Sequence, residues 1–342
     1  MPMARSTTER LSQGVPVREA GMTRVSVLTL GAAQLGLPYG RVNQTGQPSA
    51  QEAGRILTAA AAAGITHVDT ARAYGDSEAV IGATLAASPL NLQPVTKLDP
   101  LETLAGDTTP QTVAAAVEHS VTASCQALAL APTAALPLLM LHRWEHRHAW
   151  DGQVWKTLKA LQAAGRIAQL GASVQTPEEG LAALADPTVR AIQLPFNVLD
   201  DRWRAAGFDT AALKRPDCLI FARSVLLQGI LTALPDQWPP VAGADAAALC
   251  ESLQRLAGEL ARRSVQDLCF AYVLGQPWIH SMVVGVETEA QLQENLLLCR
   301  HTPLTPAETE RVAAALQGVP RALLNPAHWP ARTTQAPAED AV

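Results

Sequence analysis

The stretch LPLLMLHRWEHRHAWDGQVWKTLKALQAAGRIAQLGAS, residues 136–173, decides the fold. It opens with an apolar run, Leu136–Leu141, which is typical of a buried strand. The longer segment Asp151–Ala164 predicts a helix, and Gly165 ends it as glycine commonly does. The apolar run Ile167–Gly171 predicts a second strand. Strand, helix and strand in this order predict parallel strands joined by a crossover helix.

The same alternation runs through the rest of the chain. Further strands are predicted at Val25–Leu30, Ile65–Asp69, Pro94–Lys97, Val189–Leu194, Cys218–Ala222 and Ile279–Val284. Further helices are predicted at Ala50–Ala63, Asp76–Leu85, Pro110–Leu128, Pro177–Ala185, Asp201–Leu213, Ala244–Arg262, Ser264–Leu274, Thr288–Cys299 and Pro306–Leu316. About eight strand–helix units favour an α/β fold with a single closed (β/α)8 TIM barrel. A doubly wound sheet is the alternative, but the first strand is followed by GAAQLG (31–36) and not by G-x-G-x-x-G.

The length alone would suit two domains, but barrels routinely reach this size as one, so we expect one globular domain with short extensions. Of the 342 residues, 48% are hydrophobic and 17% are charged, which excludes disorder as the overall state. We expect the barrel to span residues 24–320, with flexible tails at 1–23 and 331–342. The N-terminal segment has no apolar run of the kind that a secretory signal needs.

Charge and cysteine usage narrow the cellular setting. The formal net charge is −5 with no basic block, which argues against a nucleic-acid partner. The longest weakly polar stretch, 127–141, is shorter than the ~20 residues of a membrane span, so no membrane partner is expected. The five cysteines are widely spaced and lack a C-x-x-C pair, which predicts a reducing cytoplasm and no zinc site. The oligomeric state stays open, a monomer included.

Polar side chains fall at the carboxyl ends of the predicted strands, where the chemistry of a barrel sits. Asp69, Lys97 and His142 end the second, third and fourth strands, and Tyr74 lies five residues past Asp69. The ends of later strands carry Ser173, Gln193, Asn197, Arg223 and Gly285.

The first four of these residues suit a proton donor for a carbonyl oxygen. A carbonyl that accepts a hydride develops negative charge and needs a proton. A phenol has an ordinary pKa of about 10, and a nearby ammonium group favours its phenolate form. We therefore expect Asp69 to keep Lys97 charged beside the tyrosine, and His142 to hydrogen-bond the carbonyl oxygen.

The sequence resembles the aldo-keto reductase superfamily over about residues 24–318. Seven segments carry the resemblance in the family's order: GITHVDTARAYGDSEAVIG (64–82), TK (96–97), LLMLH (138–142), GRIAQLGAS (165–173), QLPFN (193–197), RSVLLQG (223–229) and GVETEAQLQEN (285–295).

The resemblance implies a barrel that reduces a small aldehyde or ketone with NAD(P)H by direct hydride transfer, or runs the reverse oxidation. It implies that Asp69, Tyr74, Lys97 and His142 are the catalytic residues, with Tyr74 as proton donor. The residues that it places along the cofactor cleft are Asp69, Ser173, Gln193, Arg223, Ser224, Leu226, Gly229, Gly285, Gln291, Glu294 and Asn295.

Three positions depart from the family pattern. Val174 stands where members usually have the asparagine that holds the nicotinamide carboxamide. Arg223 stands where many members stack an aromatic ring on the nicotinamide, and a guanidinium plane can also stack. Glu287 and Gln291 replace the cations expected for the 2′-phosphate of NADPH, so we expect NADH to be used, alone or beside NADPH.

A cofactor-binding regulatory module, like the potassium-channel β subunits that resemble this family, is the alternative function. A lyase or isomerase barrel is disfavoured because no carboxylate cluster for a metal is apparent. His146 and His148 lie in the loop after His142, but we expect no metal site there because no cysteine or carboxylate stands at ligand spacing.

Overall fold

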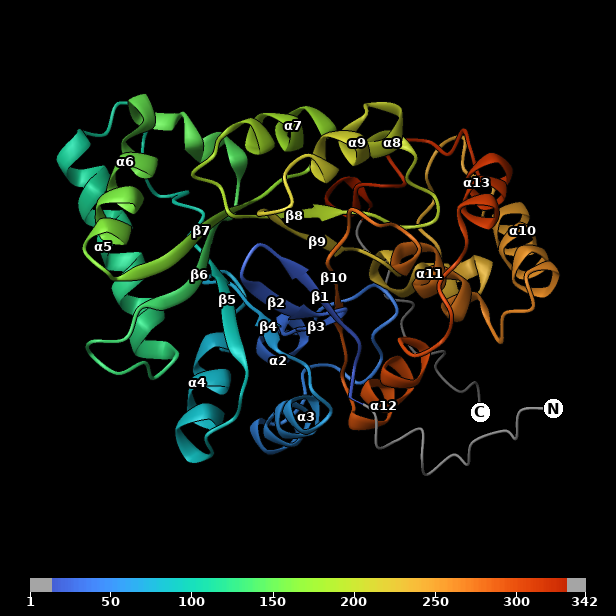
Figure 1. The fold of residues 1–342 in the computed structure, drawn as a ribbon, viewed down its shortest axis with the longest axis horizontal. Helices are drawn as coiled ribbons and strands as arrows, with labels where there is room; N and C mark the ends of the chain where they lie inside the picture. The colour runs from blue at the N-terminus through green and yellow to red at the C-terminus, as the bar shows by residue number, and fades with distance from the viewer. Residues whose placement is uncertain (1–13, 331–342) are drawn as a thin grey trace, which may run out of the picture.

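The computed structural model describes residues 14–330, in which eight parallel strands close into a barrel surrounded by helices (Figure 1). The barrel strands, in the order in which they pair around the ring, are β10 (Ser281–Gly285), β3 (Leu28–Gly31), β4 (His67–Asp69), β5 (Gln93–Lys97), β6 (Leu136–Leu141), β7 (Ile167–Ser173), β8 (Ala191–Pro195) and β9 (Leu219–Arg223). Strand β10 pairs with both β9 and β3 and so closes the ring. The predicted (β/α)8 barrel is confirmed.

The helices follow the strands in alternation. They are α2 (Ala33–Gly36), α3 (Ala50–Ala62), α4 (Ser77–Ala87), α5 (Pro110–Ala127), α6 (Ala149–Ala163), α7 (Pro177–Ala185), α8 (Arg202–Ala205), α9 (Phe208–Leu213), α10 (Ala246–Glu259), α11 (Val265–Leu274), α12 (Glu289–Leu298) and α13 (Pro306–Ala315). Short 3-10 turns lie at η1 (Trp144–Arg147), η2 (Leu227–Thr232), η3 (Pro235–Gln237) and η4 (Pro326–His328). No helix in residues 14–330 is long and apolar enough to cross a membrane.

Several helices begin at polar caps that the sequence carries. Thr176, Thr288 and Thr305 each accept a hydrogen bond from the backbone three residues on, in a reciprocal capping box. The predicted helix 201–213 is instead two helices, α8 and α9, because Gly207 takes a left-handed conformation with φ 73° between them. A chain direction that only glycine adopts easily therefore breaks a segment whose apolar pattern is continuous.

The predicted strand at residues 25–30 is also two elements. Its first part belongs to β2 (Thr23–Ser26), which pairs antiparallel with β1 (Val17–Ala20), and only the second part, β3, joins the barrel. A two-residue turn with Gly21 at φ 58° connects the pair. The expected tail at 1–23 is therefore wrong for residues 17–23, while 1–13 and the tail at 331–342 lie outside the described residues.

The hairpin β1–β2 closes the amino end of the barrel, and Figure 1 shows it at the centre of the ring of strands. Ala20 and Val25 are buried against apolar side chains that point into the barrel. Those side chains are Val95, Leu138, Met140, Ala191, Leu219 and Phe221. The guanidinium of Arg18 donates to the backbone oxygens of Leu274, Gln276 and Ile279, just before β10. The barrel interior is thus filled and sealed below, which leaves the carboxyl end for a binding site.

Candidate active site

A buried ion pair lies at the carboxyl end of the barrel. Strand β4 ends at Asp69 and the neighbouring β5 ends at Lys97. The Lys97 Nζ donates to both carboxylate oxygens of Asp69, at 2.7 and 2.8 Å, and to the Thr70 carbonyl at 2.9 Å. Burial alone lowers the pKa of an ammonium, but Asp69 and then Tyr74 outweigh it, so the Lys97 pKa lies above its ordinary value. Lys97 is therefore a fixed positive charge at neutral pH.

Two rings lie over this pair. The Lys97 Nζ is 5.1 Å from the centroid of the Tyr74 ring. The His142 ring stands edge-on to Tyr74, with centroids 5.9 Å apart and planes at 87°. The structure therefore brings together all four side chains that the sequence predicts as the reaction centre, from the ends of β4 and β5, the residue after β6 and the loop after β4.

His142 is a neutral imidazole. Burial, followed by the positive charges of Lys97 and Arg223, lowers its pKa from 6.5 to about 3. Its Nδ1 is buried and has no hydrogen-bond partner among the described residues. A neutral ring beside a fixed ammonium group can donate or accept a hydrogen bond at a substrate oxygen without gaining charge.

Two glycines let the Tyr74 loop approach α2. Gly75 has φ 53°, and a Cβ there would lie 2.3 Å from the Gly36 carbonyl oxygen. A Cβ on Gly36 would lie 1.9 Å from the Tyr74 carbonyl oxygen. Any larger residue at either position would push the phenol away from Lys97, so the contact needs glycine on both sides.

A cavity of about 750 Å³ opens above the centre. Asp69, Tyr74 and His142 line it, whereas Lys97 lies beneath them at 1% exposure. The other residues predicted along the cofactor cleft all line the same cavity: Ser173, Gln193, Arg223, Ser224, Leu226, Gly229, Gly285, Gln291, Glu294 and Asn295.

Gln193, which lines this cavity, has a side-chain oxygen without a hydrogen-bond partner among the described residues. Its Nε2 donates to the Asp69 Oδ1 at 2.7 Å, which fixes the orientation of the amide. Its Oε1 is buried and has no partner in residues 14–330. A buried oxygen without a hydrogen bond is costly, so the site suits a ligand that brings an N–H or O–H donor.

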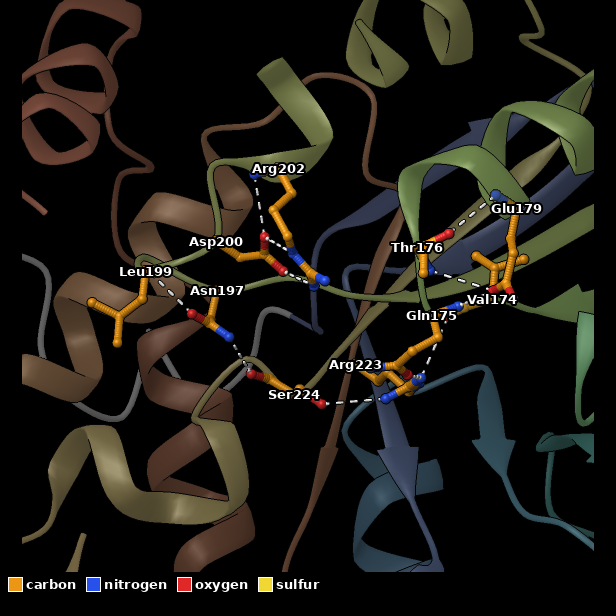
Figure 2. A network of polar contacts seen from close by, with 10 residues as sticks. All are labelled: Val174, Gln175, Thr176, Glu179, Asn197, Leu199, Asp200, Arg202, Arg223 and Ser224. Carbon is orange, nitrogen blue, oxygen red and sulfur yellow. Dashed lines mark hydrogen bonds and ion pairs between the residues drawn. The ribbon is translucent and has the colours of Figure 1, made fainter. Parts of the chain in front are cut away.

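Val174 and Arg223, which both depart from the family pattern, are connected in the structure through Gln175. Val174 is buried at 2% exposure and presents no polar group. The next residue, Gln175, lines the cavity, and its Oε1 accepts a 2.6 Å hydrogen bond from the Arg223 guanidinium. Figure 2 shows the two side chains in contact, with the Ser224 hydroxyl beside the same guanidinium. Gln175 was not predicted from the sequence, although its place two residues after the end of β7 was the available signal.

The far end of the cavity is acidic. The residues that line it are Glu287, just before α12, and Gln291, Glu294 and Asn295 within α12. The Gln291 side chain is engaged in the helix cap, where its Oε1 accepts from the Glu287 backbone at 2.7 Å. Among the described residues that line the cavity, the lysines and arginines are Arg143 and Arg223, which follow β6 and end β9.

Two loops meet over the cavity. Leu227, Gln228 and Gly229 are all left-handed, with φ of 48°, 54° and 88°. The Tyr39 hydroxyl, from the loop after α2, accepts a 3.4 Å hydrogen bond from the Gln228 amide. Tyr39 was not predicted from the sequence, because a tyrosine in an irregular loop has no periodic pattern that would mark it.

Within residues 14–330 no group of three or more His, Cys, Asp or Glu side chains could hold a metal ion. His146, in the loop after β6, packs against Trp150 with ring centroids 5.8 Å apart. The histidines of this loop are thus part of the protein's packing around the site.

Comparisons with known proteins agree with the barrel fold. A sequence model of the Aldo/keto reductase family matches residues 27–317. A search of curated proteins finds no match. The holo form of aldo-keto reductase AKR11C1 from Bacillus halodurans superposes with a TM-score of 0.70 at 21% identity, covering 88% of this chain and 96% of that one. PA4992 of Pseudomonas aeruginosa, named as an aldo-keto reductase, gives a TM-score of 0.61 at 23% identity, covering 84% and 96%.

At these identities the solved structures share the fold, and the family match rests on the sequence itself. The matched residues run from β3, the first strand of the barrel, to α13. The chain is a member of the aldo/keto reductase family.

Proposed function

We propose that this protein reduces a small aldehyde or ketone to the alcohol, or runs the reverse oxidation, with NAD(P)H and with Tyr74 as the proton donor. The carrying observation is the Lys97 ammonium group, held by two oxygens of Asp69 and lying 5.1 Å from the Tyr74 ring centroid beneath one cavity. Family membership supports an oxidoreductase acting on a carbonyl.

The residues of the cavity fit a nicotinamide cofactor, which would supply the hydride when bound. The unpartnered Gln193 Oε1 is suited to accept an N–H of the carboxamide, with the Ser173 side chain beside it. The hydrogen bond from Arg223 to the Gln175 Oε1 leaves the Gln175 amide N–H groups to supply the donor that Val174 lacks. The similar Bacillus halodurans protein is known in holo and apo forms, which supports a site that loads and unloads.

Each of the four central side chains has a distinct task. Tyr74 gives a proton to the developing alkoxide of the substrate. Lys97 stabilises the phenolate left behind, and Asp69 holds Lys97 charged inside the barrel mouth. His142, which is neutral, orients the carbonyl oxygen by a hydrogen bond.

The acidic far end of the cavity supports use of NADH, alone or beside NADPH. Glu287 would repel a 2′-phosphate and could accept a hydrogen bond from a ribose hydroxyl. Arg143 and Arg223, the cations among the described lining residues, follow β6 and end β9, and neither belongs to α12 or to the turn before it.

The deciding experiment is a panel of sugar aldehydes, aromatic aldehydes and α-keto compounds, run with NADH and with NADPH. Turnover that disappears in Tyr74→Phe supports the proposal. Cofactor binding with negligible turnover across the panel would favour the regulatory-module alternative.

All five cysteines are unpaired, which supports a cytoplasmic setting.

A further inference from the structure

Glu78 is a buried carboxylate that the proposed chemistry does not use. It lies in the first turn of α4, four residues after Tyr74, and its side chain is 2% exposed. Carboxylates are rarely buried so completely unless a specific set of partners holds them. A helix N-terminus favours negative charge, but that effect alone does not require burial.

The two oxygens of Glu78 contact two different parts of the site. The Oε1 accepts a 2.5 Å hydrogen bond from the Thr96 hydroxyl, and the Oε2 lies 2.5 Å from the Arg72 guanidinium. Thr96 directly precedes Lys97 in β5. Arg72 stands two residues before Tyr74, in the loop that carries the phenol.

The same loop is joined to β5 through its backbone. The Arg72 amide donates to the Lys97 carbonyl oxygen at 3.3 Å, and the Thr70 amide donates to the Val95 carbonyl oxygen at 2.8 Å. Glu78 therefore adds a side-chain bridge where the loop leaves the strand, just before it reaches Tyr74.

We infer that Glu78 is a positioning residue, which fixes the Tyr74 phenol against the Lys97 ammonium group by tying Arg72 to Thr96. The inference rests on the proposed function for its link to turnover, although the restraint on the loop can be measured without any substrate. A carboxylate is required, because it can accept from a hydroxyl and from a cation at once. A glutamine would accept on one side and turn an N–H donor toward the other.

The test compares Glu78→Gln with wild type by hydrogen exchange of residues 70–76 and by steady-state kinetics. We expect exchange of this segment to quicken at least tenfold, kcat to fall at least tenfold, and the Kd for NADH to stay within threefold. Arg72→Met should give a similar loss, and the double variant should be no worse than either single one, because both remove the same bridge.

Asp200→Asn is the matched control. Asp200 is equally buried at 1% exposure and pairs with Arg202 at 2.7 Å, but it does not contact the Tyr74 loop. A purely structural role for Glu78 predicts that both variants lower the Tm and leave the exchange of residues 70–76 unchanged. If Glu78→Gln does not fold, Thr96→Val replaces it in this test. It removes the hydroxyl that binds Glu78 and keeps the ion pair between Glu78 and Arg72.

The outcomes separate this inference from the proposed function. If Tyr74→Phe abolishes turnover while Glu78→Gln and Thr96→Val keep wild-type kcat, the positioning role is overturned and the proposed function stands. If Tyr74→Phe keeps its turnover, the proposed function fails, and the exchange measurement alone decides: quicker exchange of residues 70–76 supports the restraint, and unchanged exchange overturns it.

Discussion

The Nζ of Lys97 lies 2.7 Å and 2.8 Å from the two carboxylate oxygens of Asp69, with the side chains only 1% and 5% exposed. A bidentate pair this deeply buried has no water to replace either partner. Removing one charge leaves the other in a medium where an isolated ion is unstable.

Asp69→Asn is therefore expected to lower the free energy of unfolding at pH 7 by about 3–5 kcal/mol. Because the pKa of Lys97 is raised in the folded protein, its stabilisation is complete below about 10.5 and is lost as the pH rises through the raised value. The gap between variant and wild type, measured by urea unfolding, should be widest near neutrality and narrow in alkali. Asp186→Asn, which breaks a more exposed pair with Arg147, should cost clearly less.

Tyr74→Phe should lower kcat by at least about 10², because the variant keeps the ring and removes the only atom that gives the proton. Binding of NADH, followed by fluorescence titration, should stay near wild type. Tyr39→Phe makes the same change in the other phenol that lines the cavity and is expected to lower kcat less than about tenfold. Equal effects of the two substitutions would contradict the assignment of the donor.

Buried histidines are expected to make the protein sensitive to acid. Burial lowers the pKa of His67 and His280 to about 4 and, together with the charge of Lys97, that of His142 to about 3. In the unfolded chain each binds a proton near its ordinary value of 6.5, so stability is full above that pH and falls as the pH drops below it.

His142→Asn should accordingly make the loss of unfolding free energy between pH 6.5 and 4.5 shallower, by up to about 1.4 kcal/mol per pH unit. Urea unfolding at pH 7.0 and 5.0 measures the difference. The exposed His119→Asn should leave the slope as in wild type. An unchanged slope in His142→Asn would show that this ring is already protonated in the folded protein.

Arg223→Ala should raise the ratio of alcohol oxidation to carbonyl reduction. A fixed positive charge near the redox ring disfavours the oxidised, cationic nicotinamide, so the substitution removes a bias toward reduction. The ratio is to be measured at matched cofactor saturation. Arg143→Ala removes the other arginine lining the cavity, which pairs with Glu102 and is 45% exposed, and should change the ratio less. An unchanged ratio in Arg223→Ala would count against the charge effect.

Cofactor choice follows from the acidic end of the cavity. We expect kcat/KM with NADPH to be no more than a hundredfold above that with NADH. Glu287→Lys should raise kcat/KM with NADPH at least tenfold, about 1.4 kcal/mol of transition-state stabilisation. Glu289→Lys, two residues on and outside the cavity lining, makes the same charge change and should leave the preference unaltered.

Sequence patterns predict the elements whose ends are marked by the residues of the element itself. Leu136–Leu141 and Pro177–Ala185 have the predicted ends, because an apolar run and a capping box with Pro177 mark them locally. The division of residues 25–30 between a hairpin and the barrel escaped prediction. Both pieces are apolar, and only the tertiary partners, Val17–Ala20 for one and β4 for the other, tell them apart.

The clustering of Asp69, Lys97 and His142 was predictable because each stands at or just after the end of a strand, and parallel strands bring their ends to one rim. Gln175 and Tyr39 were not, since their positions depend on a contact with Arg223 and on a loop path that no local pattern encodes. The same holds for Glu78, whose partners Thr96 and Arg72 become neighbours only once the barrel has closed.

The hairpin of β1 and β2, together with the apolar side chains that fill the barrel, closes its amino end, so a ligand can enter the cavity only from the carboxyl rim. A ligand that binds against Gln193 must therefore bind before any ligand that covers it on the side of the carboxyl rim, and must dissociate after it. The hairpin β1–β2 thus restricts the order in which ligands bind and dissociate, although it lies at the opposite end of the barrel from the cavity.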